Sequence, residues 1–182
     1  TRFLGLAPTA GTESKFTKPA ATSNILTPSG VDILGRLVKN HAKMDLDGIV
    51  YKGESAFANT GLQTYLTGRL LWDPTLDAEV ERVDWTRRMF GEDTAVFIRI
   101  IDDRVTEWFR SCLIANGSAW PAELSALQCL YVPNFPELED LVLQAQAQSR
   151  TAIQQERFQM FLANVTIMRW RFDKAGLTKN IA

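Results

Sequence analysis

The fold is decided by one stretch of sequence, Gly68-Arg69-Leu70-Leu71-Trp72-Asp73-Pro74-Thr75-Leu76-Asp77. The apolar run at its start is typical of a helix, which must end before Pro74 because the residue preceding a proline disfavours the α region. Asp77 is a suitable N-cap for a second helix, since its carboxylate can accept hydrogen bonds from the free amides of the first turn. The stretch therefore predicts a sharp helix–corner–helix joint, with Trp72 held in the bend.

Helical spacing of apolar residues begins near Ala58 and continues well beyond this joint. We expect Gly91 to end the helix that follows the joint, and Asp93 to cap a long central helix. Two further helices are expected to begin at Pro136 and near Thr151. The residues expected to face inward are Leu62, Tyr65, Leu66 and Leu70; Val80, Val83 and Phe90; Phe97, Ile100, Ile101, Val105, Trp108 and Phe109; Leu138, Leu141, Val142 and Ala145; and Phe158, Phe161, Leu162, Val165 and Met168.

The residues before Ala58 follow a different pattern. Residues 1–28 are irregular apart from Phe3-Leu4-Gly5-Leu6, which could form a short strand. Thr27-Pro28 is a suitable helix start, because it offers a capping hydroxyl and a proline at the first helical position, and this helix should run to about Lys43. Gly48-Ile49-Val50-Tyr51 then indicates a short buried strand. Its partner must be either Phe3–Leu6 or residues outside this chain.

These patterns predict a mainly α fold, a bundle of about five to six helices preceded by a short β/α unit that could be the last unit of a barrel. We divide the chain into residues 1–57, the irregular segment plus this β/α unit, and residues 58–182, the helical bundle domain. Because the chain begins with Thr1 rather than Met, we expect it to come from a longer protein.

Composition disfavours several classes of function. The 182 residues include 20 basic and 21 acidic side chains, so bulk charge does not favour a nucleic-acid-binding surface. No window reaches the roughly 18 apolar residues that span a bilayer, so no membrane contact is expected. The single histidine, His41, cannot by itself anchor a histidine-based metal site, and we expect neither a metal nor a cofactor. Cys112 and Cys129 are interpreted as small apolar fillers, and a disulfide between them stays open as the alternative.

The tryptophans are numerous for this length, namely Trp72, Trp85, Trp108, Trp120 and Trp170. Each lies among apolar residues at helical spacing, so most of them are expected in the core. Trp120, beside Pro121, is the one expected to be partly exposed. Exposed indole rings would instead support contact with carbohydrate, because aromatic rings stack on sugars.

The candidate substrate-binding residues are Tyr51, Lys52 and Glu54, which end or directly follow the predicted strand. The C-terminal end of a strand is where α/β enzymes place their working groups. Glu54 could act on a sugar and Lys52 could bind a hydroxyl or a carboxylate, although residue types alone favour an ordinary polar loop. Asp102 and Asp103 are adjacent on a helix and are expected to point in different directions, so they do not form the acid/base pair that glycoside hydrolysis needs. We assign no catalytic residue.

A family resemblance rests on the motifs Asp47-Gly48-Ile49-Val50-Tyr51-Lys52-Gly53-Glu54, Leu62-Gln63-Thr64-Tyr65-Leu66-Thr67-Gly68-Arg69-Leu70-Leu71-Trp72-Asp73-Pro74 and Phe90-Gly91. They resemble the end of the barrel and the start of the C-terminal helical region in α-glucuronidase-like glycoside hydrolases. A related group of bacterial proteins shares the order helix, Leu-Trp-Asp-Pro, helix, Phe/Tyr-Gly, helix, and the segment Gln155 to Phe158 fits that group better. The order of elements matches over about residues 25–172, and the motifs match over about residues 47–91.

The resemblance implies that the catalytic carboxylates lie mostly on barrel strands that precede this region. A (β/α)₈ barrel takes about 200 residues or more, so this chain cannot hold one. The first hypothesis is therefore the C-terminal helical part of a carbohydrate-active glycoside hydrolase, which supports the catalytic barrel and shapes the substrate cleft. Its partners would be the carbohydrate substrate, through the parent enzyme, and either the missing barrel domain or a second copy in a homodimer.

The alternative is a free-standing helical protein–protein interaction module without catalytic activity. A complete small enzyme is disfavoured, because convergent histidine, cysteine and carboxylate groups are scarce.

Overall fold

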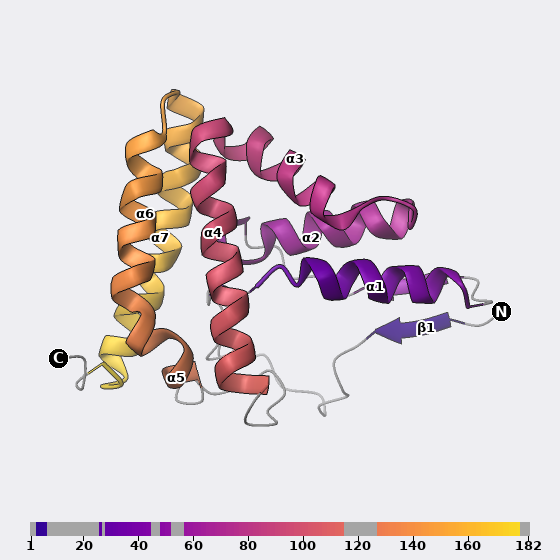
Figure 1. Cartoon of the computed structure of the whole chain (residues 1–182). Coiled ribbons are helices and arrows are strands. Elements are labelled where there is room, and N and C mark those ends of the chain that lie inside the picture. The colour runs from indigo at the N-terminus through magenta and orange to yellow at the C-terminus, as the bar shows by residue number, and fades with distance from the viewer. Residues whose placement is uncertain are drawn as a thin grey trace, which may run out of the picture.

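The computed structural model describes residues 3–6, 26, 28–44, 48–51, 57–114 and 127–178, and its fold is mainly α (Figure 1). The expected fold class is confirmed. In chain order the elements are β1 (Phe3–Leu6), α1 (Val31–Ala42), β2 (Gly48–Tyr51), α2 (Phe57–Trp72), α3 (Ala78–Phe90), α4 (Glu92–Phe109), a π-helical turn (Arg110–Ile114), α5 (Gln128–Tyr131), a 3₁₀ turn (Val132–Asn134), α6 (Phe135–Gln148) and α7 (Ala152–Lys174).

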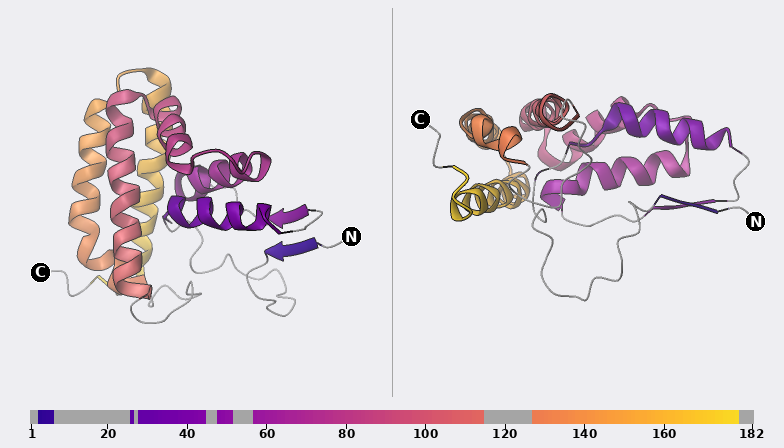
Figure 2. Two further views of the ribbon diagram at one scale, coloured as in Figure 1. Left: turned by 45° about the vertical axis from the view of Figure 1, so that its right-hand side comes forward. Right: turned by 90° about the horizontal axis from the view of Figure 1, so that it is seen from below.

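The two strands form a parallel pair with α1 between them in sequence. The register runs from Phe3 opposite Gly48 to Leu6 opposite Tyr51, so Phe3–Leu6 is the partner of the second strand. Within the described ranges, β1 and β2 pair only with each other. Figure 2 shows the pair beneath α1, away from the upright helices α4, α6 and α7.

The helices form two groups, each with its own hydrophobic core. Figure 1 shows α4, α6 and α7 side by side, with α1 and α2 running crosswise to them and α3 as the link. The main core between the upright helices and α3 is rich in aromatic rings, including Phe90, Trp108, Tyr131, Phe135, Phe158, Phe161 and Phe172. A smaller core of Leu34, Val38, Leu66 and Leu70 joins α1 to α2.

The predicted joint between α2 and α3 is confirmed, but Trp72 is exposed and is not held in the bend. The Asp73 carboxylate accepts hydrogen bonds from the backbone N (3.0 Å) and Oγ1 (2.6 Å) of Thr75, which shapes the corner. Asp77 caps α3 by accepting from the amides of Glu79 and Val80.

The prediction that most tryptophans are buried is wrong for two of them, because Trp72 is 87% exposed and Trp170 is 60% exposed. Trp72 follows the buried Leu70 by two residues, and two residues turn a helix by about 200°, which places the ring on the outer side. Trp170 stands in the same relation to the buried Met168. Trp108 is buried, Trp85 is partly buried, and Trp120 lies outside the described residues.

Helix starts differ from the prediction in two places. The first helix begins at Val31 after Gly30, whose φ of 63° is left-handed, so Pro28 precedes α1 instead of opening it. The cap of α4 is Gly91, and Asp93 lies inside the first turn. The starts of α6 and α7 agree, since Pro136 lies in the first turn of α6 and Thr151 caps α7.

Most of the expected inward faces are confirmed, but Val80 and Ile100 are exposed. The buried face of α3 is instead largely polar, with Glu81, Arg82 and Thr86 beside Phe90. Arg82 occupies that face because its partners lie on α4, as described below. Ile101 is buried as expected, and Ile98 is buried in place of Ile100.

Gly91 should be intolerant of any side chain. Its φ is 83°, and a Cβ there would overlap the side-chain amide of Gln154 on α7. We expect Gly91→Ala to lower the free energy of unfolding by about 1–3 kcal/mol, the usual range for a non-glycine residue in such backbone.

The matched control is Gly68→Ala on an exposed turn of α2, where a Cβ meets no atom within 4 Å. That variant should gain about 0.5–1 kcal/mol, because alanine favours a helix interior over glycine. Urea unfolding followed by circular dichroism measures both, and equal stability of the two variants would contradict the role of Gly91.

Candidate functional site: an ionic cleft between three helices

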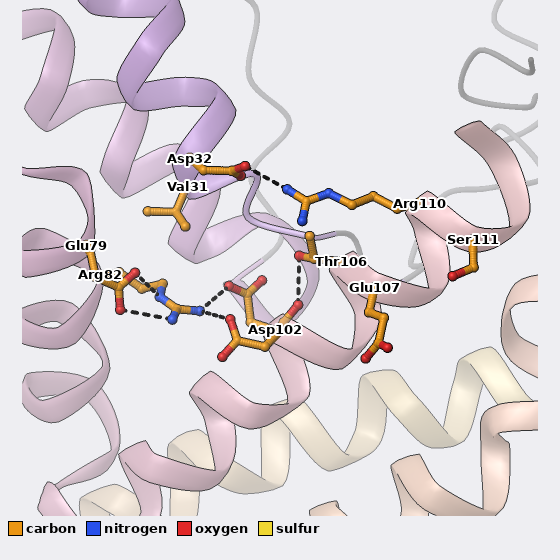
Figure 3. A pocket seen from close by; sticks show the side chains of 10 residues that line it. Val31, Asp32, Glu79, Arg82, Asp102, Thr106, Glu107, Arg110 and Ser111 are labelled. Carbon is orange, nitrogen blue, oxygen red and sulfur yellow. Dashed lines mark hydrogen bonds and ion pairs between the residues drawn. The ribbon is translucent and has the colours of Figure 1, made fainter. Parts of the chain in front are cut away.

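An open cleft of about 440 Å³ lies between α1, α3 and α4 (Figure 3). Its lining residues are Val31, Asp32, Glu79, Arg82, Asp102, Asp103, Thr106, Glu107, Arg110 and Ser111. Carboxylates outnumber guanidinium groups in this lining, so the cleft is acidic.

Arg82 on α3 is the centre of the cleft. Its Nη1 donates to Asp102 Oδ2 (3.0 Å) and to Asp103 Oδ1 (2.6 Å) on α4, and its Nε and Nη2 donate to the Glu79 carboxylate (2.8 and 2.9 Å). Figure 3 shows the guanidinium of Arg82 reaching from α3 toward Asp102. The expectation that Asp102 and Asp103 diverge is therefore wrong, because both accept from one nitrogen of Arg82.

The segment that leads into α1 is joined to the same network. Ser29 donates to Asp102 twice, from its backbone N (2.8 Å) and from Oγ (2.6 Å). Asp32 in the first turn of α1 accepts from Arg110 Nη2 (2.6 Å) beyond the end of α4. Through these bonds one ionic cluster joins the start of α1, α3 and α4.

Burial and hydrogen bonding act in opposite directions on Arg82. Burial by itself lowers the pKa of the guanidinium, since a charge is less stable away from water. Hydrogen bonds to Glu79, Asp103 and Asp102 raise the pKa by more, so the net pKa lies above its ordinary value and Arg82 stays charged.

The acidic side chains that line this cleft all form ion pairs. Glycoside hydrolysis needs one carboxyl group that can donate a proton and a second that acts as base or nucleophile. Here each lining carboxylate already pairs with an arginine: Asp32 with Arg110, Glu79, Asp102 and Asp103 with Arg82, and Glu107 with Arg104. No cluster of three or more metal-ligating groups occurs among the residues that the structure describes.

A second polar cluster lies at the joint between α2 and α3. Arg69 donates to both oxygens of Glu81 (2.9 and 3.2 Å), and the Tyr65 hydroxyl donates to Glu81 Oε2 (3.0 Å). The hydrogen bond from Arg69 is the main reason that the pKa of Glu81 lies below its usual value, against the opposing effect of burial. Burial, followed by the bond to Glu81, raises the pKa of Tyr65. The exposed ring of Trp72 stands one helical turn after Arg69.

The residues predicted to bind substrate are only partly described. The backbone of Tyr51 ends β2 opposite Leu6, so it lies at the C-terminal edge of the parallel pair. The Tyr51 side chain, Lys52 and Glu54 lie outside the described residues. The structure brings together Arg82, Asp102 and Ser29 instead, and the sequence offered only the adjacent pair Asp102-Asp103 as a signal for that cluster.

Comparison with known proteins gives one short similarity. No protein-family profile matches the chain, and no solved structure matches it. A segment of 44 residues is 46% identical to alpha-glucuronidase A of Aspergillus tubingensis. It covers 24% of this chain and 5% of that enzyme, so it indicates at most a relationship to a glycoside hydrolase. In the described part of the chain, no helix combines the length and apolar character needed to cross a membrane.

Removing Arg82 should leave Asp102 as a buried, unpaired charge, since their side chains are only 8% and 10% exposed. We expect Arg82→Met to lower the free energy of unfolding by about 3–5 kcal/mol, as when one partner of a buried ion pair is removed.

Arg88→Met is the matched control, because Arg88 pairs with Asp84 on the exposed face of the same helix. It should leave the unfolding midpoint in urea within experimental error of the parent chain. If the two variants unfolded at the same urea concentration, Arg82 would not hold the three helices together.

Proposed function

We propose that this chain is the helical part of a glycoside hydrolase, where it supports a catalytic barrel and shapes the substrate cleft. The parallel pair β1–β2 is the observation that carries this proposal. Parallel strands are normally covered on both faces and belong to sheets of more than two strands, because a lone pair leaves many backbone groups without partners. Among the described residues each strand has one partner only, so further strands are expected to come from a larger body.

The chemistry of the cleft supports the same proposal. Its carboxylates are all paired with arginines, which suits a scaffold and leaves the acid and the nucleophile to another part of the enzyme. The short similarity to an alpha-glucuronidase supports a link to glycoside hydrolysis, and we propose an α-linked glucuronic acid as the group that the parent enzyme releases. The contribution of this chain to the substrate cleft would come from Tyr51, Lys52 and Glu54, since working groups of barrels gather at the C-terminal ends of strands.

Activity measurements test this proposal. The chain of 182 residues by itself should release no glucuronic acid from oligosaccharides that carry it in α-linkage, whereas the protein extended by its barrel should release it. Turnover by this chain alone would overturn the supporting role.

In the extended enzyme, Lys52→Ala should raise KM about tenfold, as expected when a hydrogen bond to a charged group of roughly 1.5 kcal/mol is lost. Lys39→Ala, on an exposed position of α1, is the matched control and should leave KM unchanged. Equal KM values for the two variants would remove Lys52 from the cleft.

A second candidate function, an interaction module, is favoured by the outer face of α7. Ile153, Met160 and Ile167 recur at intervals of seven residues, and with Trp170 they are between 45% and 60% exposed. We call these residues and the exposed Ala163 the α7 stripe. The opposite face of α7 is buried in the core, so this helix is apolar on two sides.

The heptad spacing of the α7 stripe suits another helix, and we propose a second copy of this chain as its occupant. An antiparallel pair of α7 helices places Ile153 opposite Trp170 and Met160 opposite Ala163, as a two-fold interface requires, and it places Ile167 opposite the exposed Glu156. The small Ala163 side chain near the crossing point allows the two helices to approach closely.

Light scattering after size exclusion tests this second candidate. The parent chain should elute as a dimer, and Ile167→Glu should convert it to a monomer, because the new carboxylate would lie opposite the carboxylate of Glu156 in the second copy. Val80→Glu, which changes an exposed apolar residue on α3, should remain dimeric. A monomeric parent chain, or a dimer that survives Ile167→Glu, would exclude the α7 stripe as the interface.

A further inference from the structure

A disulfide joins the end of α4 to the short helix α5. Cys112 lies in the π-helical turn Arg110–Ile114 and Cys129 lies in α5, with their Cα atoms 6.0 Å apart. Cys112 is buried in the main core, whereas Cys129 is exposed. The filler interpretation of the two cysteines is therefore wrong, and the disulfide left open by the sequence is the one that the structure contains.

Each cysteine is two residues away from a side chain that holds the N-terminal segment. The hydroxyl of Tyr131 donates to the backbone oxygen of Leu26, and both residues are buried. Arg110 donates to Asp32 at the start of α1, in an exposed ion pair that contributes little by itself. The buried contact of Tyr131 is thus the main attachment on the α5 side.

The helix that carries Tyr131 is very short. A single helical turn such as Gln128–Tyr131 is not stable by itself, because nucleation of a helix is unfavourable. Its position depends on the burial of Leu127, Leu130 and Tyr131 and on the disulfide at Cys129. The disulfide closes a loop between the two cysteines. Without it this loop is open, so the chain gains more conformational entropy when α5 detaches.

We propose that the Cys112–Cys129 disulfide is a redox-sensitive latch that holds the β1–α1–β2 unit against the helical bundle. In the oxidised chain α5 keeps Tyr131 on Leu26 and so restrains the segment that leads into α1. In the reduced chain α5 detaches more often, and the β1–α1–β2 unit becomes more mobile while α6 and α7 keep their packing.

The opening step is a thiol–disulfide exchange with a dithiol. A thiolate of the dithiol attacks the exposed Cys129 sulfur, the bond between the two cysteine sulfurs breaks, and Cys112 leaves as a thiolate that takes up a proton. The second thiol of the dithiol then attacks the mixed disulfide and releases Cys129 as a thiol. The dithiol ends as a cyclic disulfide, so its two electrons and two protons are now carried by the two cysteines.

Hydrogen exchange followed by mass spectrometry tests the latch on the intact chain. Addition of dithiothreitol should speed the exchange of amides in α1 by about tenfold or more, and leave those of α7 unchanged, as expected for local opening. The double variant Cys112→Ser/Cys129→Ser should show the fast exchange without reductant and no response to it. Tyr131→Phe, with the disulfide intact, should also speed exchange in α1, because it removes the bond to Leu26.

Three outcomes would overturn the latch. Alkylation of the unreduced, denatured protein could reveal two free thiols, in which case the disulfide does not form. Exchange in α1 could stay the same after reduction, so that the disulfide does not restrain this unit. Exchange in α1 and α7 could rise together, so that the disulfide stabilises the whole fold instead of a local contact.

Discussion

The buried guanidinium of Arg82 is the constraint on which the arrangement of the helices depends. A charge away from water must have partners for all of its donors, and here they come from α3 itself and from Asp102 and Asp103 on α4. Asp102 in turn accepts from Ser29, just before α1. Three elements far apart in sequence must therefore meet at one point, which an apolar contact alone would not specify.

This meeting point fixes how the helices are arranged relative to one another, which the supporting role that we propose would need. The aromatic core gives α4, α6 and α7 a fixed packing, and the Arg82 network fixes α1 relative to them. The strands β1 and β2 flank α1 in sequence and pair with each other in parallel beneath it. The free edges of this pair could be continued by strands of a catalytic domain, as the supporting role that we propose requires.

Much of the fold could be predicted from local sequence, because helix faces and caps depend on neighbouring residues. Asp77, Thr151 and the buried Phe158 and Phe161 behaved as their spacing indicated. Whether a single aromatic ring is buried is harder to predict from neighbouring residues. Trp72 lies among apolar residues, yet it falls on the outer side of its helix.

The candidate site could be predicted far less well than the fold. Arg82 and Asp102 are twenty positions apart on different helices, and nothing in either neighbourhood marks them as partners. The position of Ser29 depends on where α1 begins, which Gly30 rather than Pro28 decides. The disulfide could not be predicted from local sequence either, because Cys129 reaches Cys112 only when α5 packs near the end of α4.

The central claim, that this chain supports a larger catalytic body, is tested most directly by the size of the native protein that carries it. An antibody raised against the paired helices α6 and α7 would detect that protein in an extract of its source. The account predicts a single polypeptide that exceeds these 182 residues by at least the roughly 200 residues of a barrel. A native protein no longer than this chain, folded and stable without a partner, would contradict it.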